Sequence, residues 1–328
     1  MKKKIAIVFT GGTISMKVDP SLNAAIPGMT SEEIMSKVTN IEKFADFEII
    51  KFSNMPGPHM TLDSMFELSQ KVKELTSRKD ISGVIVTHGT DTLEETAYFL
   101  DLTLSTEKPI VVVGAMRNGS ELGYDGPSNI AAAICTAISD DSSNRGVLVV
   151  LNNEVNAARE VTKTNTLALN TFKSPEFGPL GIVDNDEVIY YRSLQEHKVI
   201  DIDNVDTKVG LVKACVGMDS DLINYMIDTG YNGIVIEGMG RGNLPPNMIS
   251  GIKKALSKDI PVVLVSRCHT GRVLDTYGYE GAGRTLTDAG VILGFNLPGQ
   301  KARIKLIVAL CHTKNMKEIK SIFEKGLY

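Results

Sequence analysis

The sequence predicts an α/β protein with two domains: a large N-terminal domain on a mostly parallel, doubly wound sheet, and a smaller C-terminal α/β domain. Two observations support this fold class. Short runs rich in Val and Ile alternate with longer amphipathic stretches, and a polar, acidic segment interrupts this alternation after Tyr191. Alternating strands and helices favour parallel strands joined by crossover helices, with both faces of the sheet covered.

The first domain is expected over residues 1–191. Its buried strands are short apolar runs bounded by turn residues, and its helices are longer segments with helical periodicity. The predicted strands are Ile5–Phe9, Gly83–Thr87, Pro109–Gly114 and Gly146–Leu151, and the predicted helices are Thr61–Thr76, Leu93–Leu104 and Ser128–Ser139.

Residues 192–207 are predicted to form an exposed connection, because Asp201, Asp203 and Asp206 lie close together in a polar stretch. The alternation resumes in a second domain, residues 208–328. Its predicted strands are Val209–Lys213, Gly233–Glu237 and Pro261–Ser266, and its predicted helices lie near Asp219–Thr229, Pro245–Ser257 and Thr313–Lys325.

Composition and charge exclude several classes of function. The 328 residues carry a net charge of −4 with no long basic run, which argues against nucleic acid or an anionic membrane as partner. No stretch approaches the roughly 18–20 apolar residues that span a bilayer, and the run Ile5–Phe9 is too short for a signal peptide. We therefore expect a cytoplasmic protein. The four cysteines are scattered, and no His, Cys and carboxylate cluster suggests a metal site, so neither metal nor organic cofactor is expected.

Two threonine-containing segments each follow a predicted strand directly. They read Phe9-Thr10-Gly11-Gly12-Thr13-Ile14 and Thr87-His88-Gly89-Thr90-Asp91-Thr92. Ligands of open α/β sheets bind outside the carboxyl ends of the strands, so we expect both segments to border one crevice. The glycines lack a Cβ atom, which lets the backbone turn sharply and approach a ligand closely.

The second segment opens the predicted helix Leu93–Leu104, whose free N–H groups suit an anion or a developing oxyanion. We expect Thr92 or Asp91 to cap this helix, with Glu95 in its first turn. Turns and caps without chemistry remain an alternative, as does a phosphate-binding loop. Neither segment carries the Walker A or dinucleotide-binding glycine pattern, which weakens the nucleotide alternative.

Together the two segments resemble the motifs of the bacterial-type L-asparaginase family, also called the asparaginase/glutaminase family. Further stretches similar to that family follow in the same order and cover essentially the whole chain. They are Val113–Arg117, Asp125–Pro127, Val161–Thr166, Phe172–Ser174 and Gly299–Arg303.

The resemblance implies an amidohydrolase that converts L-asparagine and water to L-aspartate and ammonia. Thr13 matches the primary nucleophile, and Thr90, Lys163 and Asp91 match a second triad, in which Lys163 relays protons through Thr90. An unactivated amide needs such a nucleophile, a proton acceptor and a stabilised oxyanion. A lysine beside a carboxylate in a dehydrated pocket can serve as the proton acceptor.

The resemblance also implies the residues that bind substrate. They are Gly12, Gly57, Pro58, Gly89, Asp91, Ala115, Asn243 and Glu280. Asp91 would grip the α-ammonium group, and the Ala115 carbonyl would face the leaving amide nitrogen. Asn243 and Glu280 would come from the neighbouring subunit of a homo-oligomer, a tetramer built from dimers. Glu280 as an ordinary solvated loop charge is the alternative.

The chain departs from the family pattern at two places. Ala25 stands where many members carry a tyrosine that helps to activate the nucleophile, so either Thr13 is activated differently or Lys163 and Thr90 carry more of the proton transfer. Gly57 and Pro58 stand where the usual pattern has a serine that binds the substrate α-carboxylate, followed by a second polar residue. The lost hydroxyl predicts weaker substrate binding, with asparagine favoured over the longer glutamine.

Two other functions stay open at this point. One is the related amidase subunit of a tRNA-dependent amidotransferase; the strand that begins at Lys4 counts against it, because that family usually has an added domain before the first motif. The other is an asparagine sensor with weakened catalysis, which Ala25 and Gly57 favour and the four matched catalytic residues oppose.

Overall fold

The computed structural model describes residues 2–194 and 198–324. The chain divides into two compact units, Met1–Val199 and Ile200–Tyr328. Residues 195–197 of the predicted connection and the last residue of the predicted helix 313–325 lie outside the described residues.

The first unit is built on a sheet whose strands, in spatial order, are β12-β11-β8-β7-β6-β5-β1-β4. The strands β4, β1, β5, β6 and β7 run parallel, whereas β8, β11 and β12 are joined by antiparallel pairing. Their bounds are β1 Lys3–Gly11, β4 Ala45–Met55, β5 Gly83–Thr87, β6 Ile110–Val113, β7 Val147–Leu151, β8 Glu154–Ala157, β11 Gly181–Asp184 and β12 Glu187–Tyr190.

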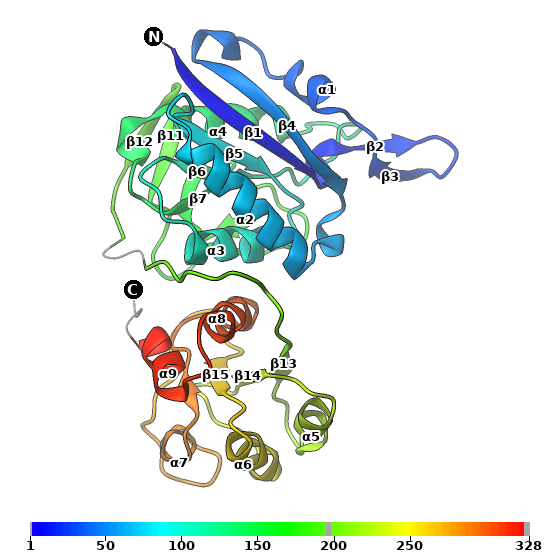
Figure 1. The fold of residues 1–328 in the computed structure, drawn as a ribbon. Helices are drawn as coiled ribbons and strands as arrows, with labels where there is room; N and C mark the ends of the chain where they lie inside the picture. Colours follow the sequence, from blue (N-terminus) through cyan, green and yellow to red (C-terminus); the bar gives the residue numbers. More distant parts are fainter. Residues whose placement is uncertain (1, 195–197, 325–328) are drawn as a thin grey trace. The chain divides into compact units, whose positions relative to one another are not determined.

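Helices cover both faces of this sheet (Figure 1). The helices α2 (Leu62–Ser77) and α3 (Leu93–Thr103) lie on one face, and α4 (Gly126–Ile138) lies on the other. Alternate residues of β1 serve the two cores: Ala6 and Val8 pack with the α2 and α3 side, whereas Ile5 and Ile7 pack with the α4 side. A sheet buried on both faces explains why these strands are continuous apolar runs. The predicted fold class is confirmed.

A small hairpin, β2 (Met16–Asp19) and β3 (Ala24–Pro27), projects from the first unit beyond β1 (Figure 1). The short helix α1 (Ser31–Met35) follows it, and its Thr30 and Glu33 form a reciprocal capping box. A second hairpin of two-residue strands, β9 (Thr162–Lys163) and β10 (Phe172–Lys173), lies later in the chain. Neither hairpin is in the sequence prediction, because both are too short to show a period.

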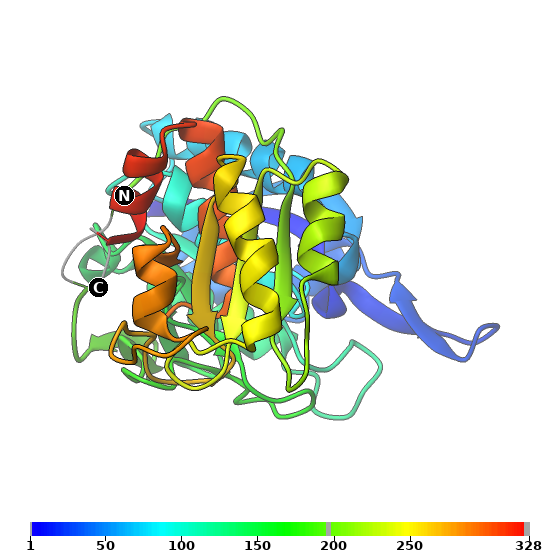
Figure 2. The same ribbon diagram turned by 90° about the horizontal axis from the view of Figure 1, so that it is seen from below.

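The second unit contains a four-stranded parallel sheet in the order β13-β14-β15-β16. Helix α8 lies on one face of it, and α5 and α6 lie on the other (Figure 2). The bounds are β13 Val209–Lys213, β14 Gly233–Gly238, β15 Val262–Ser266, β16 Ile292–Leu293, α5 Asp221–Asp228, α6 Ile249–Ser257, α7 Gly283–Asp288, α8 Gly299–His312 and α9 Met316–Glu324. Among the described residues, no helix is long and apolar enough to cross a membrane.

Candidate active site

Three loops meet beyond the carboxyl ends of β1, β4 and β5, and they meet through glycines. A Cβ atom on Gly12 would lie 2.4 Å from the Gly89 Cα atom, and one on Gly89 would lie 2.6 Å from the Gly57 Cα atom. Gly12 also has a φ angle of +83°, which side chains rarely adopt. The two threonine loops are therefore in backbone contact one residue before Thr13 and one residue before Thr90.

Thr13 begins a 3-10 turn, Thr13–Ser15, directly after β1, and its side chain is half-buried. The Gly12 N–H donates to the Met55 carbonyl at 2.9 Å, which ties the start of the turn to β4. The Ser15 hydroxyl lies 2.9 Å from the Gly12 carbonyl oxygen, so it braces the turn from its other end. The nucleophile candidate thus sits on a short, hydrogen-bonded turn.

Thr90, Asp91 and Lys163 form a contacting group. The Lys163 ammonium lies 3.0 Å from the Thr90 hydroxyl and 2.7 Å from an Asp91 carboxylate oxygen. Thr90 is buried, the Lys163 side chain is 18% exposed and the Asp91 side chain is 61% exposed. The lysine therefore reaches from an open edge, where Asp91 meets solvent, to a hydroxyl in the interior. This geometry suits proton transfer between a threonine and an amine.

The β9–β10 hairpin carries Lys163 to this position. Phe172 on β10 is buried in the core beneath α2 and α3. The connecting turn is closed by Asn165, whose side-chain oxygen accepts from the backbone N–H groups of Leu167 and Ala168 at 2.8 and 3.0 Å. The buried Phe172 ring and the turn closed by Asn165 therefore hold in place a segment for which the sequence predicts no helix or strand.

Thr92, one of the two predicted candidates, is the N-cap residue of α3, but no side-chain hydrogen bond caps the helix. Both side chains have other partners: Asp91 pairs with Lys163, and the Thr92 hydroxyl donates to the Gly57 carbonyl at 2.8 Å. Glu95 lies in the first turn, as predicted. Thr92 therefore links the Thr90 loop to the Gly57 loop.

The loop after β6 places Ala115, which is fully buried, beside the same group. A Cβ atom on Gly114 would lie 2.8 Å from the His88 carbonyl oxygen and 3.1 Å from the Thr90 methyl carbon, so the two loops are packed together. Asp125 accepts from the N–H groups of Met116 and Arg117 at 3.0 and 2.9 Å. These bonds fix the path of the backbone at Ala115.

His88 supports the Thr90 loop from within. It is fully buried, and its Nδ1 atom lies 2.9 Å from the Gly89 carbonyl oxygen. Burial lowers the pKa of His88 to about 4, so the ring is neutral at neutral pH and donates from Nδ1. Among the described residues, its Nε2 atom has no hydrogen-bond partner. The predicted site does not include His88.

The two places where the sequence departs from the family pattern, at Ala25 and at Gly57-Pro58, lie on different parts of the first unit. Gly57 is buried at the start of a 3-10 turn, Gly57–His59, whereas Pro58 and His59 are exposed. Ala25 lies on β3 opposite Val18 and is exposed on the projecting hairpin. A different phenol reaches the Thr13 turn: the Tyr124 hydroxyl donates to the Ile14 carbonyl at 2.5 Å. Nothing in the sequence pattern distinguishes this tyrosine from an ordinary loop residue.

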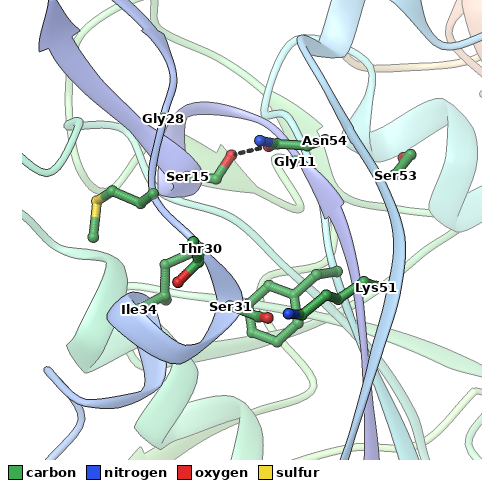
Figure 3. A pocket seen from close by; sticks show the side chains of 11 residues that line it. Gly11, Ser15, Gly28, Thr30, Ser31, Ile34, Lys51, Ser53 and Asn54 are labelled. Carbon is green, nitrogen blue, oxygen red and sulfur yellow. Dashed lines mark hydrogen bonds between the residues drawn. The ribbon is translucent and has the colours of Figure 1, made fainter.

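A pocket of about 320 Å³ borders the Thr13 turn from another side (Figure 3). Its lining includes Gly11, which precedes the turn, and Ser15, the last residue of the turn, together with residues of β4 and α1. The Ser15 hydroxyl lies 2.9 Å from the Asn54 side-chain oxygen at the edge of this pocket. Its lining contains neither Thr13, Thr90 nor Lys163, so the pocket adjoins the Thr13 turn without including the candidate catalytic residues.

Asn243 and Glu280, the residues predicted to come from a neighbouring subunit, both lie in the second unit. Asn243 forms a narrow turn in which its N–H and carbonyl pair with the backbone of Met239. Its side-chain oxygen has no hydrogen-bond partner in the part of the chain that is described. Glu280 is exposed and precedes Gly281, whose φ angle is +83°. Across residues 2–194 and 198–324, no group of three or more His, Cys, Asp and Glu side chains is placed to hold a metal ion.

Comparisons with known proteins agree along both units. The family model described as "Asparaginase, N-terminal" matches residues 4–196, and the model described as "Glutaminase/Asparaginase C-terminal domain" matches residues 208–323. The chain is similar to an L-asparaginase of Bacillus licheniformis, with 37% identity over 96% of this chain and 97% of that protein. It is also similar to L-asparaginase 2 of Escherichia coli, with 35% identity over 98% of this chain and 92% of that protein.

Solved structures agree as well. The crystal structure of a "Probable Cytoplasmic L-asparaginase" from Campylobacter jejuni matches with a TM-score of 0.89 and 32% sequence identity. The match covers 98% of this chain and 99% of that chain.

Proposed function

This chain belongs to the asparaginase family, and from that membership and the contacts around Lys163 we propose that it hydrolyses L-asparagine to L-aspartate and ammonia. The observation that carries the proposal is the Lys163 ammonium, which lies 3.0 Å from the Thr90 hydroxyl and 2.7 Å from Asp91. A lysine shared between a hydroxyl and a carboxylate is suited to moving a proton at a reacting amide.

The proposed reaction has two steps. The Thr13 hydroxyl oxygen attacks the side-chain carbonyl carbon of asparagine while its proton passes through the Thr90 hydroxyl to the Lys163 amine, and the tetrahedral intermediate expels ammonia once its nitrogen has taken a proton back. Water then attacks the acyl-threonine ester, which releases aspartate and restores the Thr13 hydroxyl. Backbone N–H groups near Thr13 and Thr90 would stabilise the oxyanion of both steps. Lys163 passes the protons through Thr90.

The close backbone contact of Gly12 with Gly89 supports this division of roles. It holds the two threonine loops together without intervening side chains, so an amide bound between them can meet both threonines. Attack then needs the Thr13 oxygen only about 3–3.5 Å from the amide carbon. Asp91 is exposed at the open edge and already meets one ammonium group. We assign it the substrate α-ammonium as well, with the Ala115 carbonyl facing the leaving nitrogen and Gly12, Gly57, Pro58 and Gly89 lining the rest of the substrate site.

Ammonia release from asparagine tests the proposal directly. Wild-type protein should release ammonia, and Thr13→Ala and Lys163→Ala should each lose activity by at least about 100-fold. Trapping of an acyl adduct on Thr13 by mass spectrometry after an acid quench would identify the nucleophile. A wild-type protein that binds asparagine without releasing ammonia would instead support the sensor function.

Glutamine hydrolysis should be slow in comparison. The longer side chain needs both of its charged ends held while an extra methylene is accommodated, and Gly57 supplies no hydroxyl for the α-carboxylate. Parallel measurements of kcat/KM for the two amides check this. Equal values for asparagine and glutamine would contradict it.

We further propose that the active site is completed by a neighbouring subunit in a dimer of dimers in the cytoplasm. The unpartnered Asn243 oxygen and the exposed Glu280 carboxylate, both in the second unit, support a role toward another chain. The name of the Campylobacter jejuni protein supports the location.

Subunit complementation tests the shared site. Thr13→Ala and Glu280→Ala chains should each be inactive alone, whereas mixed oligomers formed by refolding them together should regain activity, because some of their sites then combine an intact Thr13 with an intact Glu280. Inactive mixed oligomers of normal size would contradict a shared site.

A further inference from the structure

Glu94 is a buried carboxylate that the proposed reaction leaves without a role. It is the second residue of α3, two positions after the N-cap Thr92, and only 6% of it is exposed. One of its carboxylate oxygens accepts from the Thr162 hydroxyl at 3.1 Å and from the Lys163 backbone N–H at 3.3 Å. The carboxylate thus contacts the residue that carries the proton relay, across a sequence separation of 69 residues.

A buried charge of this kind needs a physical reason, because removing a carboxylate from water is costly. Two features of its surroundings stabilise a carboxylate at this position. The first turn of a helix presents free N–H groups and the positive end of the helix dipole. Two donors from the hairpin strand β9 then converge on the same oxygen. The charge is therefore placed to bind β9 strongly to the start of α3.

The start of α3 also carries the other members of the catalytic group. Thr90 and Asp91 directly precede the N-cap, and they contact the Lys163 ammonium at 3.0 and 2.7 Å. Lys163 is consequently held at both ends by one short stretch of chain: its backbone by Glu94 and its side chain by Thr90 and Asp91. A lysine has a flexible four-carbon stem, so a fixed backbone restricts where its ammonium can lie.

Hydrogen bonds inside the β9–β10 hairpin maintain its shape but do not join it to α3. The Thr164 N–H donates to the Thr171 carbonyl at 2.9 Å, and the Asn165 N–H donates to the Thr171 hydroxyl at 2.7 Å. The bonds to Glu94, in contrast, cross from the hairpin to the helix. From this difference we propose that Glu94 is a positioning residue that sets the distance between the Lys163 amine and the Thr90 hydroxyl. The inference rests on the proposed role of Lys163 as proton relay.

Substitution of Glu94 should therefore act on turnover. Glu94→Ala should lower kcat on the order of 10- to 100-fold, with KM for asparagine within about three-fold of wild type, because a displacement of about 1 Å can cost that much in rate. Glu94→Gln keeps an acceptor oxygen at the same reach and should recover most of the lost kcat. Thr162→Val, which removes one donor from a half-buried side chain, should lower kcat by about three- to ten-fold.

A matched control lies in the same helix. Asp101 is also buried, and it also accepts a backbone N–H from another element, that of Val147 at 2.8 Å. Asp101→Ala should therefore leave kcat within about two-fold of wild type, even where the unfolding midpoint falls. A loss of kcat in Asp101→Ala equal to that in Glu94→Ala would show a general structural effect and overturn the inference.

A double-mutant cycle separates this inference from the proposed function. In a Lys163→Ala background, Glu94→Ala should change the residual rate by less than about two-fold, because the residue it positions is absent. An undiminished effect in that background would overturn the inference, as would wild-type kcat in both Glu94→Ala and Thr162→Val. If Glu94→Ala fails to fold, Thr162→Val alone decides between these outcomes. Full activity in Lys163→Ala itself would instead remove the proton-relay role from the proposed function.

Discussion

The hydroxyl of Tyr124 donates a 2.5 Å hydrogen bond to the carbonyl of Ile14, the residue after the proposed nucleophile. The loop that carries Tyr124 also meets β2 of the adjoining hairpin through two hydrogen bonds. The Gly119 N–H donates to the Met16 carbonyl at 2.8 Å, and the Val18 N–H donates to the Ser120 hydroxyl at 3.0 Å. Burial raises the pKa of Tyr124 well above its ordinary range, so the phenol remains a donor at neutral pH.

Tyr124→Phe should lower kcat for asparagine by about five- to ten-fold with a smaller change in KM. The substitution keeps the ring and removes only the bond to Ile14, and a hydrogen bond of this kind contributes about 1–1.5 kcal/mol. Steady-state kinetics check the prediction.

Tyr190→Phe is the matched control for Tyr124→Phe. Tyr190 is a partly buried phenol on β12, whose hydroxyl lies 2.7 Å from that of Ser142. The substitution Tyr190→Phe should leave kcat unchanged, because β12 lies at the opposite edge of the sheet from β4. Equal kinetics for wild type and Tyr124→Phe would show that the bond to Ile14 does not assist Thr13.

Gly57→Ser should lower KM for asparagine on the order of 10-fold or more. A serine hydroxyl would add a charge-assisted hydrogen bond to the substrate α-carboxylate, and such a bond contributes roughly 1.5–3 kcal/mol. Space at this position is tight but sufficient: a Cβ atom would lie 3.3 Å from the Gly89 carbonyl carbon, so the neighbouring loop must move by a few tenths of an ångström. Kinetics on asparagine and aspartate inhibition constants provide the measurement.

The control for Gly57→Ser is Gly57→Ala, which introduces the same Cβ atom without the hydroxyl. Its KM should equal or exceed that of wild type. If serine and alanine behave alike at position 57, the hydroxyl does not reach the α-carboxylate and the prediction is wrong.

His88 should make the free energy of unfolding fall as the pH drops below neutrality. Its pKa is about 4 in the folded protein against an ordinary value of 6.5, so between these limits the unfolded chain binds a proton that the native protein does not. The stabilisation is fully present above pH 6.5 and is lost as the pH falls to about 4, by a total of about 3 kcal/mol. Urea unfolding between about pH 7 and pH 4 would measure the slope.

His88→Gln should remove this part of the pH dependence. Glutamine does not titrate, and its amide can still donate toward the Gly89 carbonyl, which the His88 ring contacts at 2.9 Å. The difference in unfolding free energy between wild type and variant should therefore shrink as the pH falls. Parallel curves for the two proteins would assign the acid sensitivity to other groups.

Sequence reasoning located the buried parallel strands within one or two residues, because β1, β5, β6 and β7 are apolar on both faces. It did not predict β4, the edge strand, where buried and exposed residues are mixed along an eleven-residue segment. It also did not predict α8, whose buried residues run around the helix instead of forming one stripe. A helical period is visible only where one face of a helix differs from the other, and α8 has no such difference.

Some residues of the candidate site could likewise be predicted from the sequence, and others could not. Thr13, Thr90 and Lys163 lie in motifs that a reader of the sequence can recognise, and the structure brings the Thr90 and Lys163 side chains into contact. Glu94, in contrast, meets β9 through long-range hydrogen bonds from Thr162 and Lys163, and Tyr124 meets Ile14 through another. No local sequence pattern identifies such partners, since each contact depends on the packing of segments far apart in the chain.

The junction of Gly12, Gly57 and Gly89 has a consequence for attempts to redesign the enzyme. Contact between backbones sets the distance between the Thr13 turn and the Thr90 loop, because a Cβ atom at Gly12 or Gly89 would meet backbone atoms at 2.4 and 2.6 Å. Libraries aimed at bulkier amides should therefore leave these two glycines untouched and vary Gly57, which has room for a small group, and Pro58, which faces solvent beside it. Substrate range can then be altered while the spacing of the two turns stays unchanged.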